Sequence, residues 1–316
     1  MIVVPILLAL IVFLLALVIV GLVALRWSTE LIKSPGPDEL SSPSAHGLPF
    51  TEVLFRSRDG LTLHGWFIPA QGSSSFSLRD DDWATGSRGT VVFGHGRFGS
   101  KDPDLKYAPF LREAGYNSFL FDFRAHGRSE GDYTSFGLHE RKDLLGAIDF
   151  LRSKGISAVG VLGFSLGGAV GISAAATCEE IVAVIADGAF VQLRSTLARG
   201  AAERGLPQWL IRLLGPFVLW LAGRRVGGDL EESDPLRWVD KIAPRALFII
   251  HGGQDRYVST DDVRRLYDKA GEPKDLWIVP EAEHRQVDEL HPEEYQKRVL
   301  AFFKRYLVAT YKEESR

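Results

Sequence analysis

The feature that most restricts the fold of this chain is an alternation of short apolar segments with helical segments. Apolar segments of strand length cover residues 90–96, 116–123, 158–164, 181–188, 246–252 and 276–280. Segments typical of helices lie at 105–115, about 137–153, directly after 165, near 260–270 and near 292–310. This alternation is typical of a mostly parallel sheet that helices cover on both faces. The sequence therefore predicts an α/β fold, with an antiparallel pair at 51–57 and 61–69 opening the sheet.

One insertion interrupts the alternation. The stretch between the strand that ends near residue 188 and the strand that begins near residue 246 is too long for a plain crossover. Gly215 and Pro216 are expected to interrupt its most apolar part. We expect a small helical cap, at about 190–240, over the carboxyl edge of the sheet, where ligand sites of such folds lie. A pair of ordinary covering helices is one alternative, and a second membrane-contacting element with Trp209 and Trp220 is another.

The N-terminal segment 1–25 contains no charged or strongly polar side chain. As a helix it would reach about 37 Å at 1.5 Å per residue, enough to cross the roughly 30 Å hydrocarbon layer of a bilayer. A cleavable signal peptide is the alternative, but its basic leader, shorter apolar core and small-residue cleavage site are missing before Arg26. A core helix would seldom be apolar on every face. We therefore expect residues 1–26 to be an uncleaved transmembrane anchor in contact with the lipid bilayer.

The segments that flank the domain are also predicted. Residues 27–50 are expected to form a linker rich in proline, serine and glycine, and residues 51–312 a single domain. Arg26 and Lys33 follow the apolar span, so the positive-inside tendency places the domain on the cytoplasmic face. Residues 72–89 are predicted to form a polar loop. The acidic triplet at 80–82 in this loop lacks the spacing of a calcium site.

Composition argues against several classes of function. The formal net charge of −3 gives no basic excess for binding nucleic acid. The single cysteine, Cys178, excludes an internal disulfide framework. The eight histidines are scattered, and His-Glu-x-x-His and Cys-x-x-Cys do not occur. No metal and no organic cofactor is therefore expected.

The segment "VLGFSLGGA" (161–169) places one serine between glycines directly after a strand. A sharp turn from strand to helix needs small residues on both sides of Ser165, and Gly163 and Gly167 supply them. Such a turn lifts the serine hydroxyl above the sheet. It also aims the backbone N–H of Leu166 at the same place, at a helix N-terminus that favours negative charge. An ordinary serine at the start of an ordinary helix is the alternative.

A serine hydroxyl is a poor nucleophile unless a histidine, itself oriented by a carboxylate, takes its proton. The histidines after Ser165 are His251, His284 and His291. His251 ends a strand, and His291 is expected to mark the start of the closing helix. His284 and Asp255 each follow a strand, so both should lie at the carboxyl edge of the sheet. Ser165, Asp255 and His284 also follow one another in the chain order known for such triads.

A second donor for an oxyanion is expected in the glycine-rich loop 93–100, after the first parallel strand. The backbone N–H of Arg97 would pair there with that of Leu166. A simple turn is the alternative for this loop. A phosphate site is disfavoured, because Walker spacing does not occur and the Gly-x-Gly-x-x-Gly spacing in 94–99 is a weak signal on its own.

Taken together, "GHGRFGS", "FDFRAHGRSEG", "GFSLGG", "HGGQDRYV" and "EAEH" resemble the α/β-hydrolase superfamily. More narrowly, they look like its bacterial, membrane-anchored, serine-aminopeptidase-like branch. The resemblance covers roughly residues 50 to 310 and implies an α/β-hydrolase fold. It implies a triad of Ser165, Asp255 and His284, and an oxyanion hole formed by the N–H groups of Arg97 and Leu166.

The same resemblance makes residues 122–131 a structural loop near the active site. His126 in this loop is expected to be a buried, hydrogen-bonded histidine rather than a second base. Ala125 departs from the family, whose members often carry glycine there, and this raises a question about the local backbone shape.

These inferences predict a membrane-anchored serine hydrolase that cleaves ester, thioester or amide bonds through an acyl-enzyme, without metal or organic cofactor. The anchor and the apolar cap favour an acyl-chain substrate. A peptidase of the serine aminopeptidase type and a non-catalytic membrane scaffold with a hydrolase fold are the alternatives.

Overall fold

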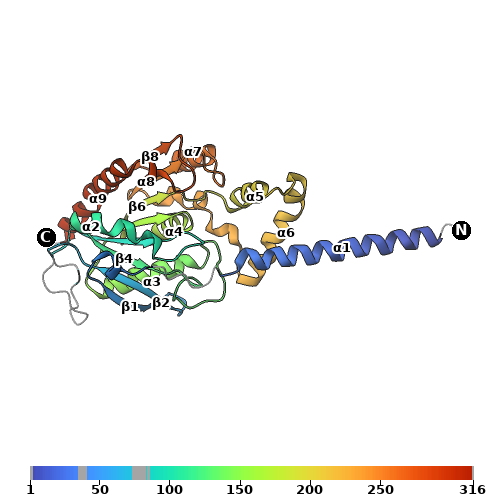
Figure 1. Cartoon of the computed structure of the whole chain (residues 1–316), viewed down its shortest axis with the longest axis horizontal. Coiled ribbons are helices and arrows are strands. Elements are labelled where there is room, and N and C mark those ends of the chain that lie inside the picture. Colours follow the sequence, from blue (N-terminus) through green and yellow to red (C-terminus); the bar gives the residue numbers. More distant parts are fainter. Residues whose placement is uncertain (1–2, 35–40, 73–82, 84–85, 315–316) are drawn as a thin grey trace.

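An eight-stranded sheet lies at the centre of the computed structural model, which describes residues 3–34, 41–72, 83 and 86–314 (Figure 1). Its strands are β1 (Thr51–Arg56), β2 (Thr62–Ile68), β3 (Thr90–Gly94), β4 (Asn117–Phe121), β5 (Val159–Phe164), β6 (Ile181–Asp187), β7 (Ala246–Gly252) and β8 (Lys274–Val279). Their spatial order is β1-β2-β4-β3-β5-β6-β7-β8. β2 is antiparallel to β1 and β4, and the pairs from β4 to β8 are parallel. The predicted mostly parallel sheet and its opening antiparallel pair are confirmed.

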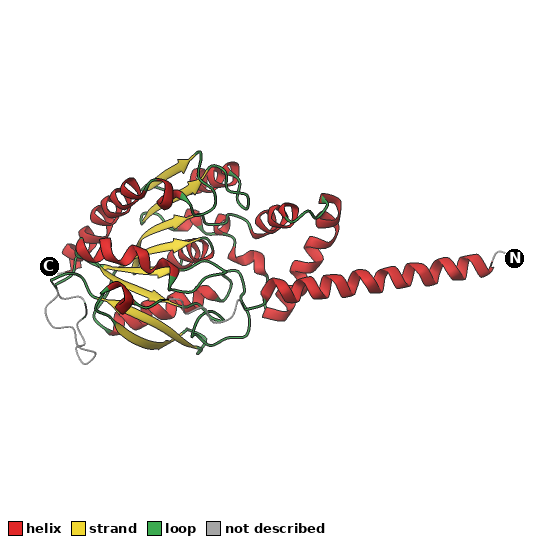
Figure 2. Ribbon diagram, in the orientation of Figure 1, coloured by secondary structure: helices red, strands yellow, loops and turns green. Residues whose placement is uncertain are grey.

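Helices cover both faces of this sheet (Figure 2). One apolar cluster joins the sheet to α3 (Glu140–Ser153), α4 (Leu166–Ala175) and α7 (Thr260–Lys269). A second cluster joins the opposite face to α2 (Ala108–Glu113), α8 (Val287–Leu290) and α9 (Pro292–Glu314). Short 3-10 helices lie at Pro43–His46 and Pro103–Tyr107. The buried strands carry apolar residues on both faces because both faces are covered, as the continuous apolar runs predict.

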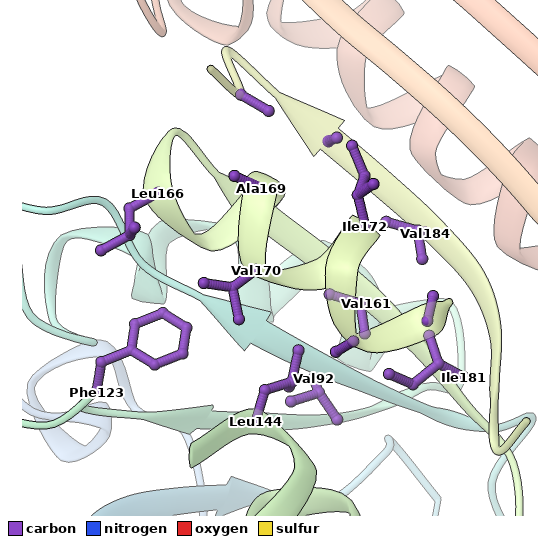
Figure 3. Close-up of a cluster of buried hydrophobic side chains, with 14 of the residues drawn as sticks. Val92, Phe123, Leu144, Val161, Leu166, Ala169, Val170, Ile172, Ile181 and Val184 are labelled. Atoms are coloured by element: carbon purple, nitrogen blue, oxygen red, sulfur yellow. The ribbon is translucent and has the colours of Figure 1, made fainter. Parts of the chain in front are cut away.

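The position of α4 explains the glycine-rich sequence around Ser165. Figure 3 shows Ala169, Val170 and Ile172 of α4 beside Val161 and Val184 of the sheet. The first turn of α4 lies so close to the sheet that a methyl group on its second residue, a glycine, would come within 1.9 Å of a backbone oxygen of β3. Small residues therefore allow the helix to start directly above the strands.

The long insertion between β6 and β7 forms α5 (Leu193–Glu203), α6 (Gln208–Val226) and short 3-10 helices at Leu230–Ser233, Pro235–Arg237 and Val239–Lys241. The predicted interruption at Gly215 and Pro216 is wrong, because α6 continues through both residues. A proline inside a helix removes one hydrogen bond, and the glycine before it has no Cβ to clash with the proline ring. Packing of α6 against α1 and α5 further stabilises the helix.

The N-terminal segment forms one long apolar helix, α1 (Val3–Ile32), most of which projects away from the domain (Figure 1). By length and composition it could cross a membrane. The helix continues past residue 26, where the anchor was expected to end, and its last turns contact the domain. Ala24, Ser28 and Ile32 are buried, and the backbone N–H of Thr134 donates to the carbonyl of Ile32 at 2.9 Å.

Two further sequence predictions fall partly outside the described residues. Residues 35–40 of the expected linker lie outside them, while the part at Pro43–His46 is a 3-10 helix. Most of the expected polar loop also lies outside, including the acidic triplet at 80–82. Trp83 of this loop is described and buried, with its ring 4.4 Å from the ring of Phe67.

Candidate active site

Ser165 occupies the sharp turn between β5 and α4. Its φ is 50° and its ψ is −108°, a left-handed conformation that residues with a side chain rarely adopt. Its backbone N–H donates to the carbonyl of Asp187 at 2.8 Å, which fixes the turn against β6. A methyl group on Gly163 would lie 2.4 Å from the carbonyl oxygen of Gly167, so the flanking glycines let the turn close. Such strain is maintained where the surrounding structure imposes it, often at functional sites.

The three side chains predicted to form a triad are in contact. Nε2 of His284 lies 3.1 Å from Oγ of Ser165, and its Nδ1 lies 2.6 Å from Oδ2 of Asp255. His284 follows β8, and Asp255 follows β7, so three separate loops at one edge of the sheet supply the three groups. This geometry allows the imidazole to accept the serine proton while the carboxylate holds the opposite nitrogen.

Asp255 is held in the form that this arrangement requires. Its side chain is fully buried, and its Oδ1 accepts backbone N–H bonds from Tyr257 at 2.8 Å and Val258 at 3.0 Å. Burial alone would raise the pKa of Asp255, but the hydrogen bond and charge of His284 and these two N–H groups hold it below its usual value. The carboxylate is therefore ionised at neutral pH and fixed in orientation.

The loop after β3 lies beside the serine. The carbonyl of His95 accepts the N–H of Gly167 at 3.1 Å, and a methyl group on Gly96 would lie 3.7 Å from Cβ of Ser165. Leu166 is the first residue of α4, so its N–H has no acceptor within the helix. These positions suit the two expected oxyanion donors, the N–H groups of Arg97 and Leu166, whose role remains a prediction.

The side chain of Arg97 fixes this loop from the outside. Its guanidinium donates to the carbonyl of Leu31 near the end of α1 and lies over the ring of Phe98 at 4.4 Å and of Phe136 at 4.5 Å. Burial lowers the pKa of Arg97 to about 10, which leaves the group charged at neutral pH. The carbonyl of Arg97 lies 2.7 Å from Nε2 of His126. The loop is thus held from two sides.

His126 is buried and hydrogen-bonded, as expected of a structural histidine. Its loop is also held by Asp122, which forms a fully buried ion pair with Lys101 at 2.6 Å. Ala125 has a φ of 60°, the left-handed conformation that glycine adopts readily. The loop therefore keeps the backbone shape that a glycine would favour, with an alanine in its place.

Neither of the other two candidate histidines makes a hydrogen bond to Ser165 among the described residues. His251 lies near the end of β7 and is buried beside the triad carboxylate, with its Nδ1 3.9 Å from Oδ2 of Asp255. His291 precedes α9, as predicted, and its Nε2 lies 2.8 Å from Oε1 of Glu281. The ring that reaches Ser165 is that of His284.

The sequence did not reveal a group of charged side chains beside His284, most of them buried. Arg285, directly after His284, has a φ of 57° and donates to the buried Asp104 at 2.5 Å. Asp187, at the end of β6, accepts the hydroxyl of Tyr295 at 2.9 Å, and burial raises the pKa of Asp187 to about 6. One signal was present in the sequence: an aspartate that ends an otherwise apolar strand.

An aromatic residue links the site to the cap. The ring of Tyr257 lies edge-on to the ring of His284, with centroids 5.3 Å apart and an interplanar angle of 81°. A methyl group on Gly200 of α5 would lie 3.4 Å from the same tyrosine ring. Residue 200 of α5 therefore lies beside the ring that contacts His284.

Within the described residues, no group of histidine, cysteine or carboxylate side chains could hold a metal ion. A surface cavity of about 810 Å³ lies away from the triad, lined by Gln192, Arg194, Glu231, Asp234, Leu236, Arg237, Arg265, Asp268 and Lys269. Some of its charged groups already pair with one another, as in the 2.7 Å contact of Arg194 with Glu231. We assign no ligand to this cavity.

Residues 91–299 match the model of the Alpha/beta hydrolase family. YqkD of Bacillus subtilis is 33% identical over 220 residues, which cover 67% of this chain and 70% of YqkD. YfhR of Escherichia coli strain K12 is 28% identical over 273 residues, which cover 84% of this chain and 82% of YfhR. Among solved structures, the esterase Pf2001 of Pyrococcus furiosus is similar, with a TM-score of 0.67 and 29% identity over 86% of this chain and 99% of that one.

Proposed function

Because this chain belongs to the alpha/beta hydrolase family, we propose that it is a membrane-anchored serine hydrolase that cleaves carboxylic esters through an acyl-enzyme. The observation that carries the proposal is the continuous contact from Ser165 through His284 to Asp255. The similarity to an esterase of 29% identity supports an ester as the substrate.

In the proposed mechanism, Oγ of Ser165 attacks the ester carbonyl while Nε2 of His284 takes its proton. The N–H groups of Leu166 and Arg97 donate to the oxygen that becomes negatively charged. The imidazolium then returns the proton to the leaving alcohol, and an acyl-serine remains. Water, activated by the same imidazole, attacks the acyl-serine, and the carboxylic acid leaves. Asp255 stays ionised throughout and stabilises the imidazolium.

Aromatic side chains beside the site support an apolar acyl group. Phe98, on the glycine-rich loop 93–100, is 70% exposed, and Tyr257, beside His284, is 37% exposed. Neither side chain carries a charge that would select an ionic substrate, and both offer apolar surface to a chain.

Membrane anchoring is part of the proposal. The apolar length of α1 supports a single span, and Arg26 and Lys33 at its domain end support a domain on the cytoplasmic side. A signal sequence would be removed, whereas the last turns of α1 are built into the domain through Ser28 and Ile32. This packing favours an uncleaved anchor.

The test is the hydrolysis of p-nitrophenyl esters of increasing chain length by the full chain. Ser165→Ala should lower kcat by about 10⁴-fold or more, because the attacking group is lost. Ser173→Ala is the matched control, since this buried serine lies on the same helix and hydrogen-bonds to the carbonyl of Val170. Equal turnover by the wild-type protein and Ser165→Ala would contradict the proposal.

The same assay separates the alternatives. A peptidase of the aminopeptidase type would cleave aminoacyl p-nitroanilides faster than the esters. A scaffold without catalysis would cleave neither class while remaining folded. The ester panel therefore decides among the three functions and gives the preferred acyl length.

A further inference from the structure

The cap helix α6 (Gln208–Val226) is apolar around most of its circumference, and two of its faces are already covered. One face packs on the end of α1 through Leu214 and Val218, which form a cluster with Ala24. A second face packs on the domain through Leu219 and Ala222. A helix that is apolar on further sides needs another partner.

The third face of α6 is exposed. It carries Trp209, Leu213, Phe217 and Trp220, whose spacing of four, four and three residues places them along one side of the helix. Their exposed fractions are 66%, 64%, 40% and 57%. The rings of Phe217 and Trp220 stack with centroids 5.6 Å apart. We call these four residues the α6 stripe. A contiguous row of large exposed apolar side chains is unusual on a protein surface and marks an interaction site.

The position of α6 relative to α1 indicates what the stripe meets. Figure 1 shows α6 running across α1 at the end of the domain from which α1 projects, and the two helices are in contact. If α1 spans a bilayer, α6 lies close to the membrane surface with its axis crosswise to the span. In that position the apolar side chains of the stripe can enter the membrane interface, as those of helices that lie in the plane of an interface do.

The charge of the two cap helices points to the same partner. Between residues 193 and 226 the sequence has six arginines, at positions 194, 199, 204, 212, 224 and 225, and one acidic residue, Glu203. All six arginines are exposed, in a chain whose formal net charge is −3. Arg194 pairs with Glu231, so the other five arginines carry the argument. Apolar side chains beside arginines are typical of surfaces that bind membranes with anionic headgroups.

We propose that the α6 stripe inserts at the boundary between the headgroups and the acyl chains of an anionic bilayer and docks the cap on the membrane beside α1. This inference rests on the proposed anchoring by α1. It gives the cap a second contact with the bilayer. It also holds the triad, which Tyr257 connects to α5, close to the lipid from which an acyl-chain ester would come.

The first experiment measures the depth of single probes in the full chain, reconstituted in vesicles of equal parts phosphatidylcholine and phosphatidylglycerol. An environment-sensitive fluorophore is attached at Leu213→Cys in a Cys178→Ala background. The controls are Leu14→Cys on the projecting part of α1 and Leu54→Cys on β1, where Leu54 is an equally exposed apolar residue at 68%. Lipids with brominated acyl chains report contact with the hydrocarbon.

The inference predicts bromine quenching at positions 213 and 14 and none at position 54. Quenching at 14 without quenching at 213 would overturn the inference and leave the anchor in place. A blue-shifted but unquenched probe at 213 would also overturn it, because protein and not lipid would then cover the stripe. No quenching at either position would refute the anchor and the inference together.

The second experiment separates docking from catalysis. A variant with serine at all four positions of the stripe should hydrolyse a soluble short-chain ester as the wild type does. Its turnover of an ester embedded in the vesicles should fall about tenfold or more, because the cap no longer rests on the lipid. Equal turnover of the embedded ester by both proteins would contradict the inference. If the wild-type protein itself did not hydrolyse the soluble ester, the proposed function would be contradicted and docking would not.

Discussion

Ser165 and its neighbours could be assigned from sequence because their chemistry is local. A glycine on each side of one serine, directly after an apolar strand, predicts the sharp turn that the structure has. The φ of 50° at Ser165 is known from the structure alone. The partners His284 and Asp255 could be chosen because each follows a strand, and parallel strands end at one edge of a sheet. Their contact in the structure gives the predicted geometry, and their catalytic role remains the proposal.

The charged side chains beside His284 could not be found in this way. Arg285 and Asp104 are far apart in the chain, and their pairing depends on which helix covers which part of the sheet. Sequence patterns locate strands and helices but do not fix the side chains that meet between them. Asp187 is the clearest example, since its environment comes from Tyr295 on α9.

Asp187 makes stability depend on pH. Burial raises its folded-state pKa from 3.8 to about 6, so the folded protein favours the neutral acid. The contribution of Asp187 to the free energy of unfolding is therefore fully present below about pH 4 and is lost as the pH rises through 6. A shift of about two units corresponds to about 3 kcal/mol. Asp187→Asn should raise the free energy of unfolding at pH 8 by an amount of this order and leave it unchanged near pH 4.

Urea unfolding at the two pH values checks this prediction. Asp261→Asn is the control, because the side chain of Asp261 is 92% exposed and should show no such difference. A stability gain from Asp187→Asn that is the same at both pH values would show that the charge of Asp187 is not its cause.

At the scale of elements, helix α4 depends on glycine at its start. A Cβ at Gly167 would lie 1.9 Å from the carbonyl oxygen of Gly94, and neither backbone can move without opening the sheet. Overpacking of this kind costs about 1–3 kcal/mol. Gly167→Ala should lower stability by at least that range and should reduce turnover, because it displaces Ser165.

A matched substitution tests whether the contact is the cause. A Cβ on Gly200 of α5 would have its nearest contact at 3.4 Å, an ordinary distance. Gly200→Ala should therefore raise stability by about 0.5–1 kcal/mol through the helix propensity of alanine. Thermal unfolding of both variants tests this prediction. If Gly167→Ala and Gly200→Ala changed the unfolding temperature equally, the contact with the Gly94 carbonyl would not be the cause of the destabilisation.

The elements themselves were largely predictable, since the strands and most helices have the period and length that their residues favour. The continuity of α6 through Pro216 was not predictable, because the sequence alone does not show that α1 and α5 pack on this helix. Packing against these helices keeps α6 intact although glycine and proline disfavour a helix.

At the scale of the whole molecule, the end of α1 belongs to the α/β-hydrolase domain. Ile32 is 6% exposed, Thr134 donates to its carbonyl, and Arg97 donates to the carbonyl of Leu31. The sequence predicted a linker from residue 27 because polar residues follow the apolar span there, and the docking of these turns depends on surfaces formed far along the chain.

Two truncations test this connection. A chain that begins at residue 23 keeps the docked turns and should unfold like the domain of the full protein. A chain that begins at residue 35 loses the burial of Ile32 and the hydrogen bond to Thr134, together worth about 3 kcal/mol. It should unfold at a lower temperature and hydrolyse soluble esters more slowly, because Arg97 loses its acceptor. Identical melting and turnover of the two truncated chains would contradict a structural role for these turns.

Covalent labelling of the folded protein by a fluorophosphonate, followed by mass spectrometry of its peptides, tests whether Ser165 is an activated nucleophile. We expect one adduct, on the peptide that contains Ser165, with labelling abolished by Ser165→Ala and strongly slowed by His284→Ala. An adduct that persists in Ser165→Ala, or a folded wild-type protein that takes up no label, would contradict this expectation.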